Sequence, residues 1–315
     1  MPVEELDVVV VGGANTDFLV RGPSLPKRGR SVQGDTFQQG PGGKGANQAV
    51  AAARLGAAVA LVARVGPDDR GDAILSRLSD ERVDASAVLR DPETETGAVL
   101  VMVDASGEKQ TMAALGANRK LASRDVVSVA KLVANARVAL LQLEVPVETV
   151  ETAVRLARAA GARVVLDSGP PQDLGEELLR NVHVIRANAV EAEALTGIEI
   201  VDRMSAAKAA ANLMRRGVQA AVIGAPGGNL LVSPDWELWF PHLDVEVVDT
   251  TGAGDAFSAA LAVCIANGKD LPSAVHFANA AAGLKATRLG AQAGLPRRDE
   301  VLGLLSRSEP TAHPA

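Results

Sequence analysis

Short runs of β-branched residues alternate with alanine-rich segments along most of this chain, and this alternation limits the fold more than any other feature. The runs predict buried strands at 6–11, 58–65, 138–142, 163–166, 182–185 and 220–223. The amphipathic segments between them, such as 147–160 and 205–216, have the period of crossover helices. Strands joined by helical crossovers pair in parallel. The sequence therefore predicts an α/β fold with a doubly wound, mostly parallel sheet flanked by helices.

Two zones, at about 17–39 and 97–115, break this alternation with short alternating pieces, prolines and glycines. They predict a small inserted β-sheet with strands at 18–20, 32–37, 97–103 and 110–115. A lid over a ligand site is a sensible use for such a sheet. We expect one domain over residues 1–306 with this lid inserted, and a disordered tail over 307–315.

Composition and charge argue against several classes of function. The 315 residues include 32 basic and 38 acidic side chains, a net charge of −6, which argues against a nucleic-acid partner held on a basic surface. The chain has no apolar run of membrane-spanning length, and its first residues lack the positive region of a signal peptide. Cys264 is the only cysteine, so a disulfide within the chain is impossible. We expect a cytoplasmic protein that acts on small molecules.

A glycine-rich turn, Asp249-Thr-Thr-Gly-Ala-Gly-Asp255, leads into the alanine-rich segment 256–267, which predicts a buried helix. Its glycines allow the amides of Gly252 to Asp255 to converge at the helix N-terminus, where the helix dipole favours an anion. A phosphoryl group in transfer needs such a cradle, and an acceptor hydroxyl needs a nearby base such as Asp255. A simple capped helix start is the alternative, because Thr and Asp are common N-cap residues.

A second glycine-rich loop begins at Gly40-Pro-Gly-Gly-Lys-Gly-Ala-Asn-Gln and runs into a predicted helix that ends near 55–56. The glycines let the backbone approach a ligand, and Lys44 and Asn47 offer directed donors. The loop is not a phosphate-binding P-loop, because Gly45 follows Lys44 where a Ser or Thr hydroxyl is needed for magnesium.

Polar residues follow several of the predicted strands, and they are Asn15, Asp17, Glu144, Asp167 and Asn188. The carboxyl ends of parallel strands meet at one edge of a sheet, which is where ligands bind in open α/β folds. One such residue would be ordinary loop chemistry. Their recurrence indicates a site at this edge.

Three motifs make the chain resemble the ribokinase-like, or PfkB, carbohydrate kinases over about residues 6–305. They are Asn15-Thr-Asp17, Gly42-Gly-Lys-Gly-Ala-Asn-Gln-Ala49 and Asp249-Thr-Thr-Gly-Ala-Gly-Asp255. The last marks the family strongly, and the Asn-Gln ending of the middle motif points to the ribokinase branch. The resemblance implies an ATP-dependent sugar kinase, with D-ribose to D-ribose 5-phosphate as the first expectation. A related acceptor, such as fructose, a deoxy sugar or a nucleoside, and a non-catalytic sugar or nucleotide binder remain open.

The resemblance also implies a role for each matching residue. The expected catalytic set is Asp255 as base, with Gly252, Ala253 and Gly254 as the anion hole. The expected sugar-binding set is Asn15, Asp17, Gly42, Gly43, Lys44, Asn47, Glu144 and Asp255. The expected nucleotide-binding set is Asn188, Gly224, Gly227, Gly228, Gly254 and Asn279. Magnesium is expected near Glu191 through water, and potassium at Asp249, Thr251, Lys285, Arg288 and Gly290. A homodimer formed through the lids is also implied.

Three departures from the family pattern bear on these expectations. The segment Ile223-Gly-Ala-Pro-Gly-Gly-Asn229 lacks the usual threonine of Thr-Leu-Gly-x-x-Gly, and Pro226 removes an amide donor. Asn279 stands where a histidine is common. Gly294 replaces a serine late in the cation loop, so we expect potassium to bind more weakly, with water in place of that ligand.

Overall fold

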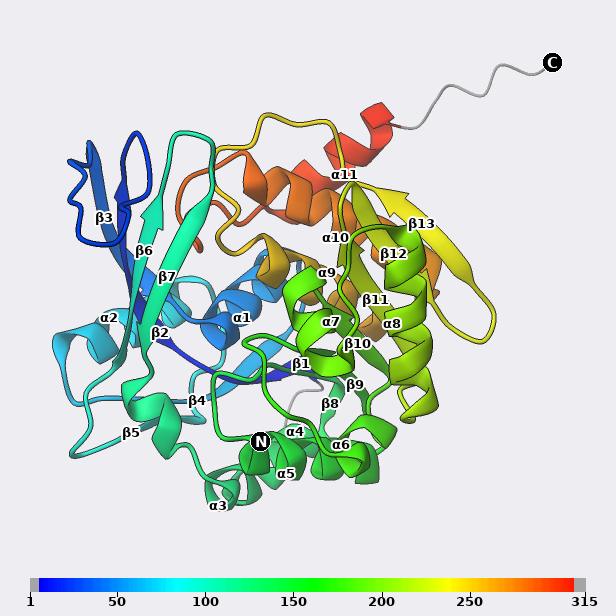
Figure 1. Ribbon diagram of the computed structural model, residues 1–315. Helices are drawn as coiled ribbons and strands as arrows, with labels where there is room; N and C mark the ends of the chain where they lie inside the picture. The colour runs from blue at the N-terminus through cyan, green and yellow to red at the C-terminus, as the bar shows by residue number, and fades with distance from the viewer. Residues whose placement is uncertain (1–5, 309–315) are drawn as a thin grey trace.

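A computed structural model describes residues 6–308, and its main feature is a nine-stranded sheet in the order β13-β12-β11-β10-β9-β8-β1-β4-β5 (Figure 1). The parallel strands are β1 (Leu6–Val11), β4 (Val59–Val65), β5 (Val88–Arg90), β8 (Ala136–Leu141), β9 (Arg163–Asp167), β10 (Val184–Ala187) and β11 (Ala220–Ala225). The antiparallel strands at one edge are β12 (Gly228–Val232) and β13 (Glu237–Pro241). The predicted α/β class is therefore confirmed.

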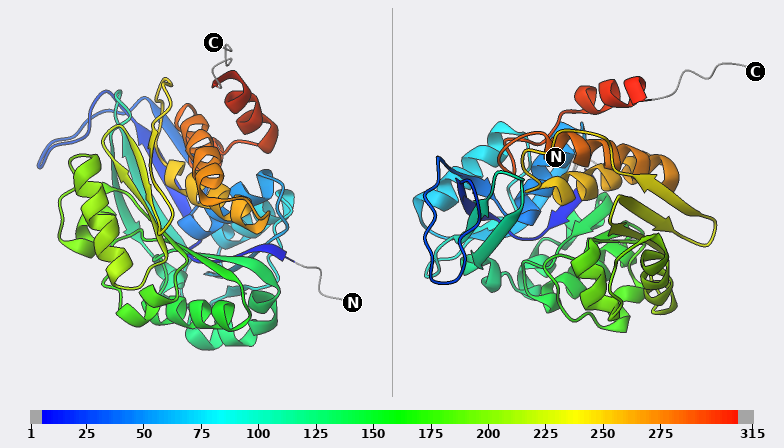
Figure 2. Two further views of the ribbon diagram at one scale, coloured as in Figure 1. Left: turned by 90° about the vertical axis from the view of Figure 1, so that its right-hand side faces the viewer. Right: turned by 45° about the horizontal axis from the view of Figure 1, so that its top comes forward.

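Helices cover both faces of this sheet, and Figure 2 shows the two groups on opposite sides. One face carries α1 (Lys44–Arg54), α2 (Asp69–Asp80), α9 (Ala253–Ala266), α10 (Leu271–Ala286) and α11 (Arg298–Ser308). The other carries α3 (Ser123–Ser128), α4 (Ala130–Ala134), α5 (Val147–Ala159), α6 (Glu176–Arg180), α7 (Ala189–Thr196) and α8 (Arg203–Arg215). In β1, Val8 and Val10 pack on the first group and Val9 and Val11 on the second, because successive strand side chains point to opposite faces.

A separate small sheet lies at one side of the molecule, with strands in the order β3-β2-β6-β7 (Figure 1). Its strands are β2 (Asn15–Arg21), β3 (Thr36–Gly42), β6 (Gly97–Val103) and β7 (Lys109–Ala114), and the short 3-10 helix η1 (Gly116–Lys120) follows. The predicted strand at 32–37 was wrong, because pairing with β2 continues from Thr36 through Pro41 to Gly42. A proline is tolerated there because β3 is an edge strand.

The segment 223–229, which departs from the family pattern, forms the hairpin between β11 and β12. Gly224 pairs with Asn229 across it, and Gly227 has a φ of 85°, which favours glycine. Of the tail expected at 307–315, Arg307 and Ser308 belong to α11, and residues 309–315 lie outside the described part of the chain. Among residues 6–308, the structure contains no helix of the length and apolar character needed to cross a membrane.

Helix α1 begins directly against the end of β1. The amide of Ala46 donates to the carbonyl of Gly13 at 3.0 Å. A Cβ on Gly45 would lie 2.6 Å from the carbonyl carbon of Gly12 and 2.7 Å from the Gly13 oxygen. Only a glycine at position 45 lets the first turn of α1 approach the sheet this closely.

We therefore expect Gly45→Ala to lower the free energy of unfolding by about 1–3 kcal/mol, because the methyl group must push α1 away from backbone atoms that cannot yield. Urea unfolding of the ligand-free protein measures this change. Gly175→Ala is the matched control, since its Cβ would meet only Glu151 Oε1, at 3.8 Å, and its φ is an ordinary −64°. Equal stabilities for the two variants would contradict the close approach.

Candidate active site

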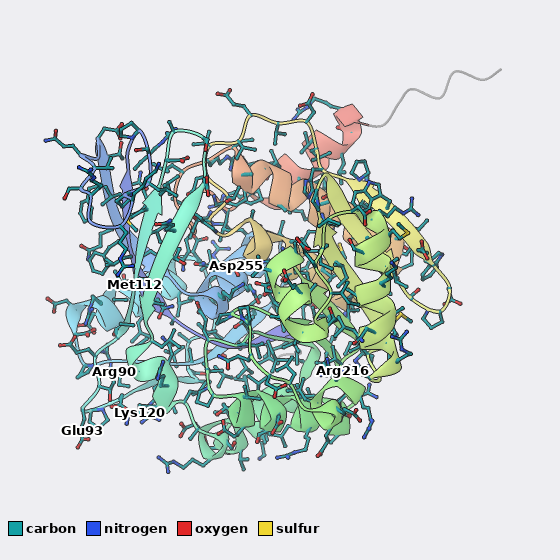
Figure 3. All side chains as sticks on the ribbon, in the orientation of Figure 1. Arg90, Glu93, Met112, Lys120, Arg216 and Asp255 are labelled. Atoms are coloured by element: carbon teal, nitrogen blue, oxygen red, sulfur yellow. The ribbon has the colours of Figure 1, made fainter. Side chains whose placement is uncertain are left out.

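Asp255 lies in the first turn of α9 near the centre of the molecule in the view of Figure 3, and its side chain is held by two amides from α1. Asn47 Nδ2 donates to Oδ2 at 2.9 Å, and Gln48 Nε2 donates to Oδ1 at 3.0 Å. Asp255 itself is 5% exposed. The Asn-Gln pair of one glycine-rich motif therefore fixes the carboxylate of the other motif, where α1 and α9 both begin.

The predicted anion hole, Gly252 to Gly254, lies at this same helix start. Gly252 is the N-cap residue of α9 with a φ of 82°. The amide of Ala253 donates to the carbonyl of Thr250 at 3.1 Å, so part of the predicted donor set is engaged within the turn. The start of the 14-residue helix α9 still favours an anion through its dipole.

A buried polar network links Asp255 to Asp167, at the end of β9. Gln48 Nε2 also donates to Asp167 Oδ2 at 3.2 Å, and Gln142 Nε2 donates to Gln48 Oε1 at 2.6 Å. Asp167 further accepts from Ser258 Oγ at 2.7 Å and from Lys44 Nζ at 3.0 Å. Burial alone would raise the pKa of Asp167, but Lys44, Arg186 and these hydrogen bonds hold that pKa below its usual range.

Most of the predicted sugar-binding residues lie together on the lid side of Asp255. Glu144 Oε2 accepts from the amide of Lys44 at 2.7 Å and from Asn15 Nδ2 at 3.4 Å. A Cβ on Gly42 would lie 2.2 Å from the Asp17 carboxyl group, so only glycine allows this approach. Burial and, as a smaller contribution, the negative charge of Asp255 raise the pKa of Asp17 to about 7. These carboxylates can accept hydrogen bonds from a ligand that carries several hydroxyl groups.

Glu144 shares this electrostatic environment. Burial raises the pKa of Glu144 to about 7, although its bond to the Lys44 amide and the Lys44 charge act in the opposite direction. Burial would also lower the pKa of Lys44, yet Asp167, Asp255 and Glu191 raise it above its ordinary value. The ammonium of Lys44 therefore stays charged among these carboxylates.

Asn118 belongs to this cluster and was missed in the sequence. Its Nδ2 donates to Asn15 Oδ1 at 2.7 Å, and its Oδ1 accepts from the Ala14 amide at 2.8 Å. Asn118 orients Asn15 from η1, 103 residues further along the chain. Neither its spacing nor its residue type marked it in advance.

On the other side of the α9 start lies a cavity of about 220 Å³, lined partly by Arg186, Thr250, Gly254, Phe257 and Asn279. Two predicted nucleotide residues, Gly254 and Asn279, thus line it. Asn279 Nδ2 donates to the Pro241 carbonyl at 2.7 Å, and Asn279 Oδ1 accepts from Asn229 Nδ2 at 3.0 Å.

The other predicted nucleotide residues, which do not line this cavity, are Asn188, Gly224, Gly227 and Gly228. A Cβ on Gly224 would lie 3.5 Å from the Asn188 Cα, so these two at least lie close together. A Cβ on Gly228 would lie 2.6 Å from the Trp239 ring. Packing of the hairpin against that ring is therefore sufficient to explain Gly228.

Asn188 and Glu191 form a reciprocal cap at the start of α7. Asn188 Oδ1 accepts from the Glu191 amide, and Glu191 Oε2 accepts from the Asn188 amide, both at 2.9 Å. The other Glu191 oxygen lies 3.9 Å from Lys44 Nζ. The predicted pair thus caps a helix and also brings a carboxylate to the site.

Arg186, at the carboxyl half of β10, is a second residue that the sequence analysis missed. One of its terminal nitrogens lies 3.6 Å from Glu191 Oε2 and 3.8 Å from Asp167 Oδ2. A Cβ on Gly254 would lie 2.9 Å from the same nitrogen. In the described part of the chain, Arg186 Nε is buried without a hydrogen-bond partner. An arginine in a buried parallel strand is a feature that could have marked this residue in the sequence. The side chain places its guanidinium at the start of α9.

The predicted cation-binding residues lie together, but their geometry does not fit a potassium ion. Asp249 Oδ1 accepts from the Thr251 amide at 2.8 Å, and Oδ2 accepts from the Gly290 amide at 2.9 Å. Lys285 Nζ donates to the carbonyls of Asp249 at 3.0 Å and of Arg288 at 2.9 Å. Two of the expected carbonyl ligands therefore already bind the ammonium of a third expected ligand residue.

Comparison with known proteins agrees with this arrangement. The model of the pfkB family carbohydrate kinases matches residues 5–298. The chain belongs to this family. A ribokinase of Haemophilus influenzae is 35% identical over 302 residues, which are 96% of this chain and 99% of that protein. A deoxyribokinase of Salmonella typhi is 30% identical over 306 residues, or 96% and 100% of the two chains.

The solved structure of Arabidopsis thaliana ribokinase complexed with ribose and ATP is similar to this carbohydrate kinase, with a TM-score of 0.84 and 33% identity. The similarity covers 95% of this chain and 98% of that one. Together with the family match, it confirms the predicted family and fold.

We expect Asp255→Asn to lower kcat of this carbohydrate kinase about 100- to 10,000-fold, because the variant keeps the shape of the side chain and loses the candidate proton acceptor. The affinity for sugar should change little, which calorimetry measures. Asp299→Asn is the matched control, since Asp299 is an exposed aspartate in the first turn of another helix, α11. Turnover within a few-fold of the parent would exclude Asp255 as the base.

Glu144→Gln should stabilise the ligand-free protein at pH 8 by about 1–3 kcal/mol, because the folded state of the parent must hold a partly buried carboxylate near other carboxylates. The carboxyl of Glu144 has its ordinary pKa of 4.5 in the unfolded chain and a pKa of about 7 in the folded protein. The advantage of the variant is therefore absent below pH 4.5, grows between 4.5 and 7, and is constant above 7.

Urea unfolding at pH 5, 6 and 8 measures this dependence. Glu148→Gln is the control, since Glu148 is exposed in the first turn of α5. A stability difference that does not change with pH would contradict the raised pKa of Glu144.

Proposed function

We propose that this carbohydrate kinase transfers the γ-phosphoryl group of ATP to the primary hydroxyl of D-ribose and forms D-ribose 5-phosphate. The observation that carries the proposal is the position of Asp255. Its carboxylate is fixed by Asn47 and Gln48 at the start of α9, with the carboxylate-rich cluster on one side and the 220 Å³ cavity on the other. The full-length similarity to ribokinases supports the choice of acceptor.

On the sugar side, we assign hydroxyl recognition to Asp17, Asn15, Glu144 and the backbone at Gly42 and Gly43. Asp255 accepts the proton of the sugar's primary hydroxyl, and the oxygen of that hydroxyl forms a bond to the γ-phosphorus. The bond between that phosphorus and the bridging oxygen breaks, and ADP leaves with the electron pair. The first turn of α9 stabilises the charge that develops on the transferring group.

On the nucleotide side, we assign the phosphates to the space between the α9 start and the charged groups of Lys44 and Arg186. Asn279 and the hairpin 224–228 then border the nucleotide. Glu191 Oε2 accepts from the Asn188 amide, whereas Oε1 lies 3.9 Å from Lys44 Nζ, so Oε1 can accept a hydrogen bond from water bound to a magnesium ion. Bound there with the phosphates, magnesium would neutralise part of their charge.

A deoxy sugar is the second candidate acceptor, because the deoxyribokinase relative is 30% identical over nearly the same length. A coupled assay of ADP release with ribose, 2-deoxyribose, fructose and nucleosides decides between acceptors. We expect the highest kcat/KM for ribose. ATP binding by calorimetry without sugar-dependent ADP release would instead identify a non-catalytic binder.

We also propose that the small sheet acts as a lid and as the contact between two copies of the chain in the cytoplasm. Its inner face holds the buried cluster of Leu19, Val101 and Val103. Its outer face exposes large apolar side chains that neighbour one another across the strands, namely Val20, Phe37, Leu100 and Met112, which are 41%, 64%, 53% and 72% exposed. A second copy would cover this face and remove its apolar side chains from water.

Met112, labelled on β7 in Figure 3, provides the test of the dimer. We expect the parent to sediment as a dimer at micromolar concentration and Met112→Asp to sediment as a monomer, because a charge would be buried without a partner at the interface. Met204→Asp is the control, since Met204 is 63% exposed on α8. A monomeric parent, or a variant that stays dimeric, would exclude this interface.

A further inference from the structure

The side chain of Lys285, at the end of α10, fills the position at which a monovalent cation was expected. We propose that the Lys285 ammonium serves as a built-in monovalent cation, so that this kinase works without potassium. This inference rests on the proposed kinase function. It makes Lys285 a positioning residue for the start of α9 rather than a source of one backbone carbonyl.

The contacts of Lys285 are those of a bound cation. Its side chain is 0% exposed, and Nζ donates to the carbonyls of Asp249 at 3.0 Å and Arg288 at 2.9 Å. The Asp249 carboxylate, also 0% exposed, has Oδ2 4.0 Å from Nζ. An ammonium group carries one positive charge and three donors, so it can satisfy carbonyl oxygens that would otherwise coordinate an ion. The Lys285 ammonium thereby pairs with the buried Asp249 carboxylate.

Gly294 makes room for this lysine. A Cβ at position 294 would lie 2.9 Å from both Cδ and Cε of Lys285. The serine expected there in the family would therefore collide with the lysine side chain. The loss of the serine at position 294 therefore makes space for the Lys285 side chain. One ligand of a free ion is lost, and the charged group of the lysine takes the place of that ion.

The position of Lys285 couples it to the catalytic turn. Asp249 binds the amides of Thr251, at 2.8 Å, and Gly290, at 2.9 Å, and so joins the turn before α9 to the loop after α10. A Cβ on Gly252 would lie 3.3 Å from the Ala291 backbone, so the two segments are in close contact. By neutralising Asp249 and binding both segments, Lys285 fixes the turn that leads into Asp255.

The charged groups around Lys285 leave the ammonium protonated at neutral pH. Burial lowers the pKa of Lys285 to about 8, with Lys109 of β7 and Arg288 acting in the same direction and with Asp249 and Asp255 opposing it. The carbonyl contacts at 3.0 and 2.9 Å and the nearby Asp249 carboxylate favour the charged ammonium. Experiments on its role as a cation belong at pH 7.

The test compares kcat for ribose-dependent ADP release at pH 7 in potassium chloride and in tetramethylammonium chloride of equal ionic strength. We expect the parent rates in the two salts to agree within about twofold. Lys285→Ala should lose about tenfold or more in tetramethylammonium and recover most of this loss in potassium or ammonium, which enter the vacated position. Lys285→Met, which fills the space without charge, should stay low in every salt. Lys269→Ala, at an exposed lysine, should behave as the parent.

Potassium activation of the parent by more than about threefold would overturn the proposal, and so would a fully active Lys285→Met. Thermal unfolding in the same two salts gives a readout that does not need catalysis. Potassium should raise the unfolding temperature of Lys285→Ala and leave that of the parent unchanged; equal effects on both proteins would also overturn the proposal. If no sugar is phosphorylated by the parent, the proposed function fails while the unfolding data still decide the role of Lys285.

Discussion

The contact between the Asp255 carboxylate and the amides of Asn47 and Gln48 is the interaction on which the rest of the site depends. It joins the beginnings of helices α1 and α9, and Asn47 and Asp255 lie 208 residues apart in the chain. Both helices begin beside Asp167, the last residue of β9, which accepts from Gln48 of α1 and from Ser258 of α9. They therefore meet at the carboxyl end of the parallel strands, where ligands bind in open α/β folds. The glycines before each helix then let the backbones approach closely enough for side chains as short as Asn and Asp to meet.

Around this contact the protein concentrates charge that it does not fully neutralise in the absence of ligands. Asp17 and Glu144 have raised pKa values because they are buried near Asp255, whereas Asp167 stays ionised beside Lys44 and Arg186. Carboxylates that are costly to bury in the ligand-free protein become useful acceptors when a polyhydroxylated ligand supplies donors. The site therefore exchanges some stability for recognition, which the pH dependence of Glu144→Gln addresses directly.

The departures from the family pattern have different structural meanings. In the segment 223–229, the glycines serve a hairpin that continues the main sheet, and Gly228 admits the Trp239 ring. In the cation loop, the loss of a serine at Gly294 is linked to the gain of the Lys285 side chain. The first departure concerns packing at the border of the 220 Å³ cavity, which Asn229 lines. The second alters how positive charge is supplied to the catalytic turn.

The sequence by itself predicted the class of fold, six strands of the main sheet and Asp255 as the candidate base. The first two follow from local periodicity, which acts over a few residues, and the third from the glycine-rich motif and the family resemblance that it carries. Tertiary structure alone decided that β3 extends to Gly42 as an edge strand, that Asn118 orients Asn15, and that Arg186 reaches the start of α9. It also decided that the Lys285 side chain, not only its carbonyl, enters the cation loop. Each of these depends on the direction of a side chain or on pairing between distant segments, and a residue's position in the sequence does not specify either until the helices and sheets have packed.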